Sequence, residues 1–224
     1  MIAALAVLAT LRPRATAHDD DKSGEGPTRS NAEGDAEVDD DATLIARHRA
    51  GDREAFATMY RNHAAAVYRR LGRILGPVPE RDDLTQDVFL ALHRALPAFR
   101  GEARLTTLIH RIAINKACEH LRRNARRPAV PTEGAVFDQL LSLAASPAER
   151  ASWREELERV FACLAKIKPK KRVALLLRVV DGMSFEEIAV LVDATPEAVA
   201  KRVQHGQREL DELYGRASRE ARMS

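Results

Sequence analysis

The chain has 224 residues, 45% of them apolar and only 4% aromatic, which allows two small domains with cores of Leu, Ile, Val and Ala. Residues 1–41 contain ten Asp and Glu against four Lys and Arg, so the net charge of +3 leaves the rest of the chain at +9, and a body this basic favours a polyanionic partner. The seven dispersed histidines show no HExxH or Cys/His metal spacing, and no glycine-rich phosphate loop exists, so the sequence nominates no metal site, cofactor, small-molecule substrate or enzyme activity.

Residues 1–40 are predicted to be a disordered acidic extension, because they are polar and poor in apolar residues after the first few positions. The apolar stretch Ile2–Leu11 has no preceding positive charge and is too short to span a bilayer, which takes about 20 residues. We therefore expect no stable membrane insertion, and a start codon placed too far upstream is the alternative. The acidic charge leaves two readings open, an inert solubilising tail or a competitor for the basic body.

Four helices are predicted in the first half of the chain. Asp41 is the expected N-cap of the first helix and Asp52 that of the second, and Asp83 with Gln86 resembles a capping box that opens the third. Gly76 and Pro77 should end the second helix, and the loop 98–104 should separate the third from the fourth. The expected helices are Thr43–Ala50, Arg53–Leu75, one that begins at Asp83, and Leu105–Arg123.

The linker 128–145 is irregular and contains Pro131 and Gly134, with a short helix possible only over Val136–Leu143. Ser146 to Glu149 forms a capping box with Pro147 at the first helical position, which predicts a helix as far as Ile167. Pro169 should start the following helix, which ends at Gly182. Cys118 and Cys163 lie inside helical patterns, and we interpret both as core residues of a protein in a reducing compartment.

Residues 184–212 have the pattern of a helix-turn-helix. Ser184 and Glu187 make a capping box for a short helix, Asp193 stands in the turn where glycine is usual, and Thr195 caps a second helix that starts at Pro196. Such a second helix suits the DNA major groove, where Arg and Gln contact base edges and Lys contacts phosphate. An ordinary helical hairpin with a solvated face is the alternative.

The helix Leu105–Arg123 is a second basic element. This helix and the residues just after it contain six basic residues and one acid, Glu119. Such a helix could follow a phosphate backbone. The favourable placement of bases at a helix end explains the later residues of this set but not Arg111. The six bases are Arg111, Lys116, Arg122, Arg123, Arg126 and Arg127.

Two DNA-binding segments joined by a linker resemble an extracytoplasmic-function (group IV) sigma factor of the sigma-70 family, over residues 41–215. Several motifs carry the resemblance in the right order. In the first half they are D-L-T-Q-D-V-F at 83–89, F-R-G-E at 99–102, R-I-A-I-N at 111–115 and L-R-R at 121–123. In the second half they are L-L-L-R at 175–178 and G-M-S-F-E-E-I-A at 182–189.

The resemblance implies an all-α fold of two small helical domains joined by a flexible linker, the second containing the helix-turn-helix. Region 2 would cover 41–127 and region 4 would cover 146–215, followed by a C-terminal tail, 216–224. The implied partners are core RNA polymerase, promoter DNA and an anti-sigma factor. The protein would be cytoplasmic, or held at the inner membrane face by a membrane-bound anti-sigma factor, and would work in stress-responsive transcription initiation.

The resemblance also assigns roles to named residues. Those expected to contact the largest-subunit coiled coil of polymerase are Asp83, Gln86, Asp87 and Arg94. The minus-ten element, with a base flipped out of the stack at a cost of a few kcal/mol, would be held by Phe99, Arg100, Glu102, Arg111, Asn115, Lys116, Arg122 and Arg123. The minus-thirty-five duplex would be read by Thr195, Lys201, Arg202, Gln204, His205 and Arg208.

Two departures from the family pattern prevent transfer of a promoter sequence from relatives. Leu108 stands where a Trp is common, so an aromatic platform for base stacking is missing there. Ala200 stands where a basic residue is frequent, with Lys201 beside it. Two alternatives remain: a helix-turn-helix regulator that never joins polymerase, which leaves the motifs at 83–89 and 99–102 unexplained, and a sigma mimic that only sequesters an anti-sigma factor.

Overall fold

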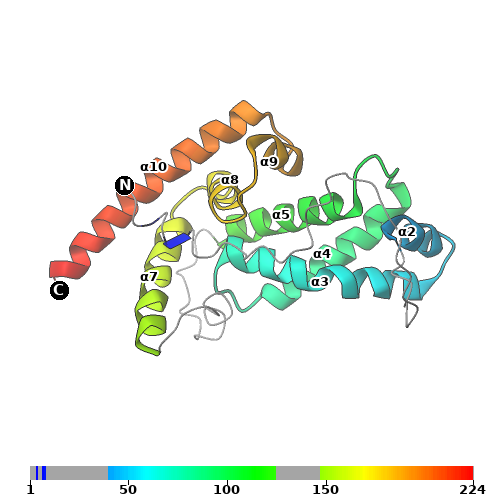
Figure 1. Ribbon diagram of the computed structural model, residues 1–224, viewed down its shortest axis with the longest axis horizontal. Coiled ribbons are helices and arrows are strands. Elements are labelled where there is room, and N and C mark those ends of the chain that lie inside the picture. Colours follow the sequence, from blue (N-terminus) through cyan, green and yellow to red (C-terminus); the bar gives the residue numbers. More distant parts are fainter. Residues whose placement is uncertain (1–3, 5–6, 9–39, 125–146, 224) are drawn as a thin grey trace, which may run out of the picture.

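The computed structural model describes residues 4, 7–8, 40–124 and 147–223. Within these ranges the chain is helical and contains no strand (Figure 1). The helices are α2 (Asp41–Arg49), α3 (Arg53–Leu75), α4 (Arg81–Ala95), the 3-10 turn η1 (Leu96–Ala98), α5 (Leu105–Asn124), α7 (Pro147–Ala165), α8 (Pro169–Val179), α9 (Phe185–Val192) and α10 (Pro196–Met223).

The helices form two halves, as the sequence predicted. In the first half α3, α4 and α5 pack against one another and α2 covers one end of α3 (Figure 1). In the second half α10 packs on α7, α8 and α9. The fully buried side chains Met59, Leu71, Leu92 and Ile109 form the centre of the first half, and Leu157, Leu164 and Leu210 lie in the second.

Several helix ends lie where the capping residues predicted them. The Asp52 carboxylate accepts a hydrogen bond from the Glu54 amide at 2.9 Å, and α3 runs from Arg53 to Leu75 as expected. Gly76 follows with φ of +75°, a conformation that glycine adopts without a steric cost. These boundaries are set by local chemistry, which is why the sequence was sufficient to find them.

Two predicted caps are wrong. The first helix begins at Asp41 itself, with Asp40 as its N-cap, and Asp41 contacts His63 at 3.1 Å. The third helix begins at Arg81, two residues before Asp83, and the preceding Glu80 makes no side-chain cap hydrogen bond. In both helices the acid lies in the first turn, where the partial positive charge of the helix start favours it without a capping hydrogen bond.

The remaining predictions concern the linker, the C-terminal tail and the N-terminal extension. The linker 128–145, the short helix at 136–143 and the side chain of Ser146 lie outside the described residues, whereas α7 does begin at Pro147. Residues 216–223, expected as a separate tail, continue α10, and the half-buried Leu213, Tyr214 and Ala217 pack against the core. In the extension 1–40, the described residues Ala4, Val7 and Leu8 are buried and belong to the apolar core cluster.

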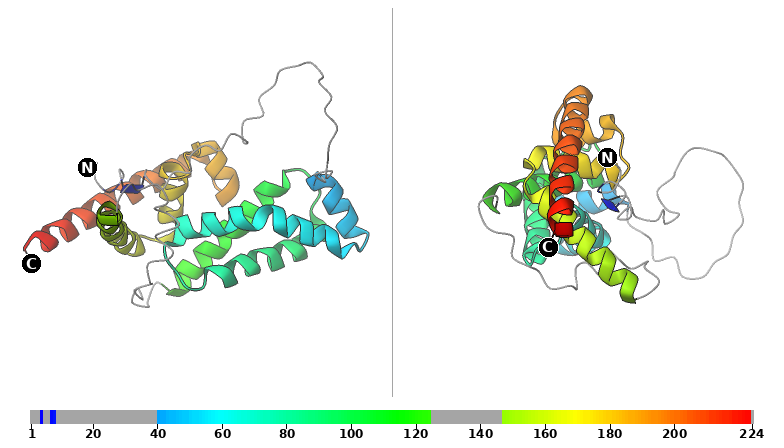
Figure 2. Two further views of the ribbon diagram at one scale, coloured as in Figure 1. Left: turned by 60° about the horizontal axis from the view of Figure 1, so that its bottom comes forward. Right: turned by 90° about the vertical axis from the view of Figure 1, so that its left-hand side faces the viewer.

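The two halves are not separate in space. Helices α8 and α9 pack against α5, and α8 also contacts α3, so that α8 and α9 lie between α10 and the first half (Figures 1 and 2). The buried apolar side chains of both halves form one continuous cluster. From the linker alone we expected the halves to move independently unless a partner holds them.

Candidate nucleic-acid interface

The helix-turn-helix has the local structure that its sequence predicts. The Ser184 hydroxyl accepts from the Glu187 amide at 3.1 Å, and the Glu187 carboxylate accepts from the Ser184 amide at 2.6 Å. Asp193 adopts the left-handed conformation, with φ of 49°, and so performs the role that glycine usually has in the turn. The Thr195 hydroxyl then accepts from the Ala198 amide at 3.3 Å and starts α10.

Helix α10 has one buried side and one exposed side. Val199, Val203 and Leu210 are buried. Gly206 is also buried, and a Cβ atom there would lie 3.2 Å from the backbone carbonyl of Lys171, so this glycine allows close packing of α10 on α8. Of the six proposed minus-thirty-five residues, Arg202 is half-buried and five are exposed: Thr195, Lys201, Gln204, His205 and Arg208.

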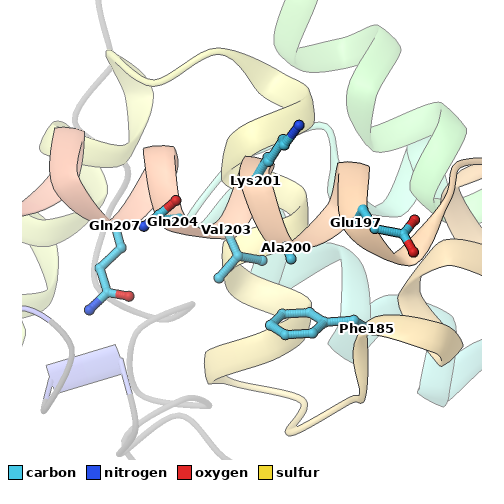
Figure 3. Close-up of a pocket in the computed structure, with 7 residues that line it drawn as sticks. All are labelled: Phe185, Glu197, Ala200, Lys201, Val203, Gln204 and Gln207. Atoms are coloured by element: carbon cyan, nitrogen blue, oxygen red, sulfur yellow. The ribbon is translucent and has the colours of Figure 1, made fainter.

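A groove of about 530 Å³ lies between the start of α9 and the first turns of α10 (Figure 3). Val203 and Ala200 point toward the ring of Phe185, whereas Lys201 and Gln204 point away from it (Figure 3). Hydrogen bonds at the helix start, from its own amide and from Thr195, lower the pKa of Glu197, so an anionic side chain lies beside Lys201. The exposed face of α10 therefore mixes hydrogen-bonding groups with charge, as contacts to base edges and phosphates require.

Helix α5 presents a second polar face. Arg111, Asn115, Arg122 and Arg123 are exposed, and the Arg122 guanidinium lies against its own helix, donating to the Cys118 carbonyl at 3.2 Å. Lys116 is half-buried because its ammonium group lies between Asp87 at 3.8 Å and Glu119 at 3.9 Å. The predicted DNA-facing residues of α5 therefore share one side of the helix, with Lys116 at its border with α4.

Burial raises the pKa of the Cys118 thiol on α5, and the charges of Arg122, Lys170 and Arg202 offset part of this. Lys170 and Arg202 belong to the second half of the chain, so that half comes close to α5 at this point.

The loop after η1 is held by a residue that sequence reasoning missed. Arg100 and Glu102 are exposed and Phe99 is half-buried. The guanidinium of Arg49, at the end of α2, donates to the carbonyl of Leu96 at 3.2 Å and to the carbonyl of Phe99. A base at the end of a helix is normally explained by the helix dipole, and no local signal relates Arg49 to a loop about 50 residues away.

Three of the four proposed polymerase contacts lie on the exposed face of α4, namely Asp83, Gln86 and Arg94, and Asp87 is half-buried. The same helix exposes 57% of Leu90, and the neighbouring Tyr60 on α3 is 39% exposed. Tyr60 and Gln86 also line a small groove of about 310 Å³ between α3 and α4. Leu90 could have been noticed in the sequence, because it is the one large apolar residue of α4 outside the buried stripe.

Among the described residues, no group of three or more His, Cys, Asp and Glu side chains could hold a metal ion. Within the same residues, no helix combines the length and apolar content that crossing a lipid bilayer requires.

Comparison with known proteins matches each half of the chain to a known protein region. Residues 59–127 match Sigma-70 region 2, and residues 157–210 match Sigma-70 region 4. The RNA polymerase sigma-H factor of Pseudomonas aeruginosa is 32% identical, over 81% of this chain and 97% of its own length. The ECF RNA polymerase sigma-E factor of Escherichia coli K12 is 31% identical, over 76% of this chain and 92% of its own.

Among solved structures, CnrH in complex with the cytosolic domain of CnrY is similar, with 25% identity and a TM-score of 0.53 over 77% of this chain and 96% of that chain. The resemblance seen in the sequence motifs is thus confirmed by two region matches in the right order and by relatives that align over nearly their whole length. This chain belongs to the extracytoplasmic-function group of the sigma-70 family of RNA polymerase sigma factors.

Proposed function

We propose that this sigma factor contacts the two promoter elements through two separate helix faces. In this proposal α5 and the loop 98–104 bind the minus-ten element as a melted strand, and α10 reads the minus-thirty-five element as duplex. The observation that carries the proposal is that each half exposes one basic, hydrogen-bonding helix face, centred on Arg111 and Asn115 in α5 and on Lys201 and Arg208 in α10.

The exposed face of α4 is the proposed site for core polymerase. Leu90 adds an exposed apolar side chain to the polar candidates Asp83, Gln86 and Arg94, and apolar anchors surrounded by polar residues are typical of stable protein interfaces. In this role the chain supplies recognition, and we assign it no catalytic chemistry of its own.

Run-off transcription with purified core polymerase, this protein and fragmented host DNA tests the proposal. We expect transcripts that start only when the protein is present, and their upstream sequences would define both elements. Binding to core without transcripts from any fragment would contradict promoter recognition. Failure to bind core at all would instead favour a helix-turn-helix regulator outside polymerase.

A paired set of variants tests the assignment of α10. Replacing both Lys201 and Arg208 with Gln should abolish transcription from the identified promoters while core binding persists. The control replaces Arg216 and Arg219 with Gln, because these residues are exposed on the same helix but lie beyond the residues that match region 4. Equal loss in both variants would show that general positive charge, and not the proposed reading face, is required.

We also propose that an anti-sigma factor restrains this protein in the cytoplasm, at the inner membrane face where that factor is membrane-bound. The support is the similarity to CnrH, whose solved structure contains the cytosolic domain of CnrY. Co-purification from unstressed cells of the native host should recover such a partner bound to both halves. Recovery of the protein without any partner other than polymerase would contradict this proposal.

A further inference from the structure

Cations from three helices gather where α8 packs against α5 (Figure 1). Burial raises the pKa of the Cys118 thiol on α5, and the charges that oppose this effect come from Arg122 on α5, Lys170 on α8 and Arg202 on α10. Further cations follow closely in the chain. We name the set Arg122, Arg123, Lys166, Lys168, Lys170 and Arg202 the α5–α8 patch; Arg202 is half-buried and the other five are exposed.

The α5–α8 patch has little compensating negative charge. None of its six side chains forms an ion pair within residues 40–124 and 147–223. Helix α8 has Lys168 as its N-cap and no acid in its first turn, although the start of a helix carries partial positive charge and favours anions. Burial lowers the pKa of His120 beside the patch, and Glu80 opposes this effect while Arg123 adds to it, so one carboxylate offsets part of the charge at the edge. Such a surface attracts a polyanion.

The chain itself contains a polyanion of matching charge. Residues 19–39 hold eight Asp and Glu against two basic residues, Lys22 and Arg29, so this segment has a net charge of −6. Both flanks of the segment belong to the folded body, because Leu8 is buried in the apolar core cluster and Asp41 begins α2. The acidic segment is therefore tied to the body on both sides.

The acidic segment is long enough to reach the α5–α8 patch from α2. Asp41 lies 3.1 Å from His63 in the middle of α3, and α8 contacts the end of the same helix, where Arg172 donates to the Leu75 carbonyl at 2.8 Å. The rise along α3 from His63 to Leu75 is on the order of 18 Å. A flexible chain of about 21 residues has a root-mean-square extension of about 25 Å. Because the two lengths are similar, the effective concentration of the segment at the patch is high, on the order of millimolar.

We propose that the acidic segment 19–39 docks on the α5–α8 patch of its own chain. The docked segment competes there with nucleic-acid phosphates, because Arg122 and Arg123 are proposed minus-ten contacts and Arg202 is a proposed minus-thirty-five contact. This consequence rests on the proposed function, whereas the docking itself does not. Of the two readings of the acidic extension, an inert solubilising tail and a competitor for the basic body, the docking favours the second.

Carbodiimide cross-linking of the full-length protein, without DNA or polymerase, tests the docking. The reagent joins a carboxylate to an ammonium group only where the two are in contact, and peptide mass spectrometry identifies the pairs. We expect the Asp and Glu of 19–39 to be joined to Lys166, Lys168 and Lys170, and rarely to Lys201, which is exposed on α10 outside the patch. These cross-links should be lost at about 1 M salt, where the Debye length is about 3 Å.

An equal mixture of unlabelled and ¹⁵N-labelled protein distinguishes docking within one chain from docking onto a second copy. Docking within the chain gives pairs of peptides with the same label, whereas docking onto a second copy gives mixed labels in about half of the pairs. The proposal is overturned if the labels are mixed in this way, if Lys201 reacts as often as the patch lysines, or if the segment gives no cross-link to the patch.

Matched charge variants measure the consequence for DNA binding. The tail variant carries Glu33→Gln, Asp35→Asn, Glu37→Gln and Asp39→Asn. The control variant makes the same change in net charge on α7 and α10, with Glu155→Gln, Glu158→Gln, Glu212→Gln and Glu220→Gln. At about 0.1 M salt, where charges more than about 10 Å apart are largely screened, the tail variant should bind a random-sequence duplex about 3–10-fold more tightly than wild type, and the control should gain much less. An equal gain in both variants would show that net charge alone opposes DNA.

The two measurements separate this inference from the proposed function. If the cross-links form but no promoter can be found by run-off transcription, the proposed function fails while the docking stands. If the wild type directs transcription but its acidic segment does not cross-link to the patch, the docking fails and the function stands.

Discussion

The ammonium group of Lys116 lies 3.8 Å from the carboxylate of Asp87, across the contact between α5 and α4. Lys116 is a proposed DNA contact and Asp87 a proposed polymerase contact, so one ion pair joins the two surfaces. The carboxylates of Asp87 and Glu119 partly neutralise the Lys116 ammonium group, so its attraction to a DNA phosphate is weaker while these contacts persist. Binding to polymerase and binding to the minus-ten strand should therefore affect each other through this pair.

Lys116→Gln should weaken binding of single-stranded minus-ten DNA by about 3–10-fold at low salt, because one phosphate contact is lost. The slope of log affinity against log salt should become shallower by about 0.7. Asp87→Asn, which leaves Lys116 in place, should not weaken DNA binding but should weaken core polymerase binding. Fluorescence anisotropy across a salt series measures the slopes, and identical slopes for wild type and Lys116→Gln would contradict the assignment.

Arg49→Met should loosen the loop after η1, because the carbonyls of Leu96 and Phe99 lose their donor. We expect a loss of about 1 kcal/mol in affinity for single-stranded minus-ten DNA, the typical net worth of such hydrogen bonds, and no change for minus-thirty-five duplex. Arg53→Met, at an exposed position at the start of α3, is the control. Competition binding with both DNA forms decides the matter, and a parallel loss on both would assign Arg49 a merely electrostatic role.

Asp193→Ala should lower the melting temperature by about 2–4 °C, since a left-handed backbone costs a residue with a Cβ atom about 1–2 kcal/mol and Asp offsets part of this locally. Asp193→Gly should not lower it, because glycine adopts φ of 49° freely. The ion pair with Arg111 contributes little to this difference, as Asp193 is 92% exposed. Differential scanning fluorimetry of the two variants is sufficient, and equal melting temperatures would remove backbone strain as the cause.

His110 should make the folded state less stable in acid. Burial, together with the charges of Arg70, His63 and Arg73 acting in the same direction, lowers the pKa of His110 to about 3. The folded state therefore keeps His110 neutral while the unfolded chain binds a proton below about pH 6.5, so stability is fully present above that pH and is lost as the pH falls toward 3. The slope for one such group is at most about 1.4 kcal/mol per pH unit.

His110→Gln should make the unfolding free energy less dependent on pH between pH 6.5 and 4.5, with a slope that is smaller by up to about 1.4 kcal/mol per pH unit. Urea denaturation at several pH values measures it. His205→Gln, a change at an exposed position on α10, provides the comparison. A wild-type slope retained in His110→Gln would show that other groups carry the acid sensitivity.

The amino-acid sequence alone determined the elements whose ends depend on nearby residues. Asp52, Ser184 with Glu187, and Thr195 marked helix starts correctly, because a capping hydrogen bond joins groups only two or three residues apart. Asp41 and Asp83 were wrongly predicted as caps, because in a sequence an Asp in the first turn of a helix looks the same as an Asp at the N-cap position. The spaced motifs of regions 2 and 4 were visible for the same reason, since each is a short run of neighbouring residues within one helix, one loop or the turn that starts a helix.

Only the tertiary structure decided which distant residues meet. Arg49 with Phe99, Arg73 with Asp181, and Arg172 with Ile74 are pairs about 50 to 108 positions apart in the chain. Helical periodicity places a residue on a face but does not say which other face it will touch, and an Arg looks the same in the sequence whether it faces DNA, solvent or a carbonyl of the other half. The packing of α8 and α9 on α5 arises from apolar burial summed over both halves, a property of the folded chain that no local pattern contains.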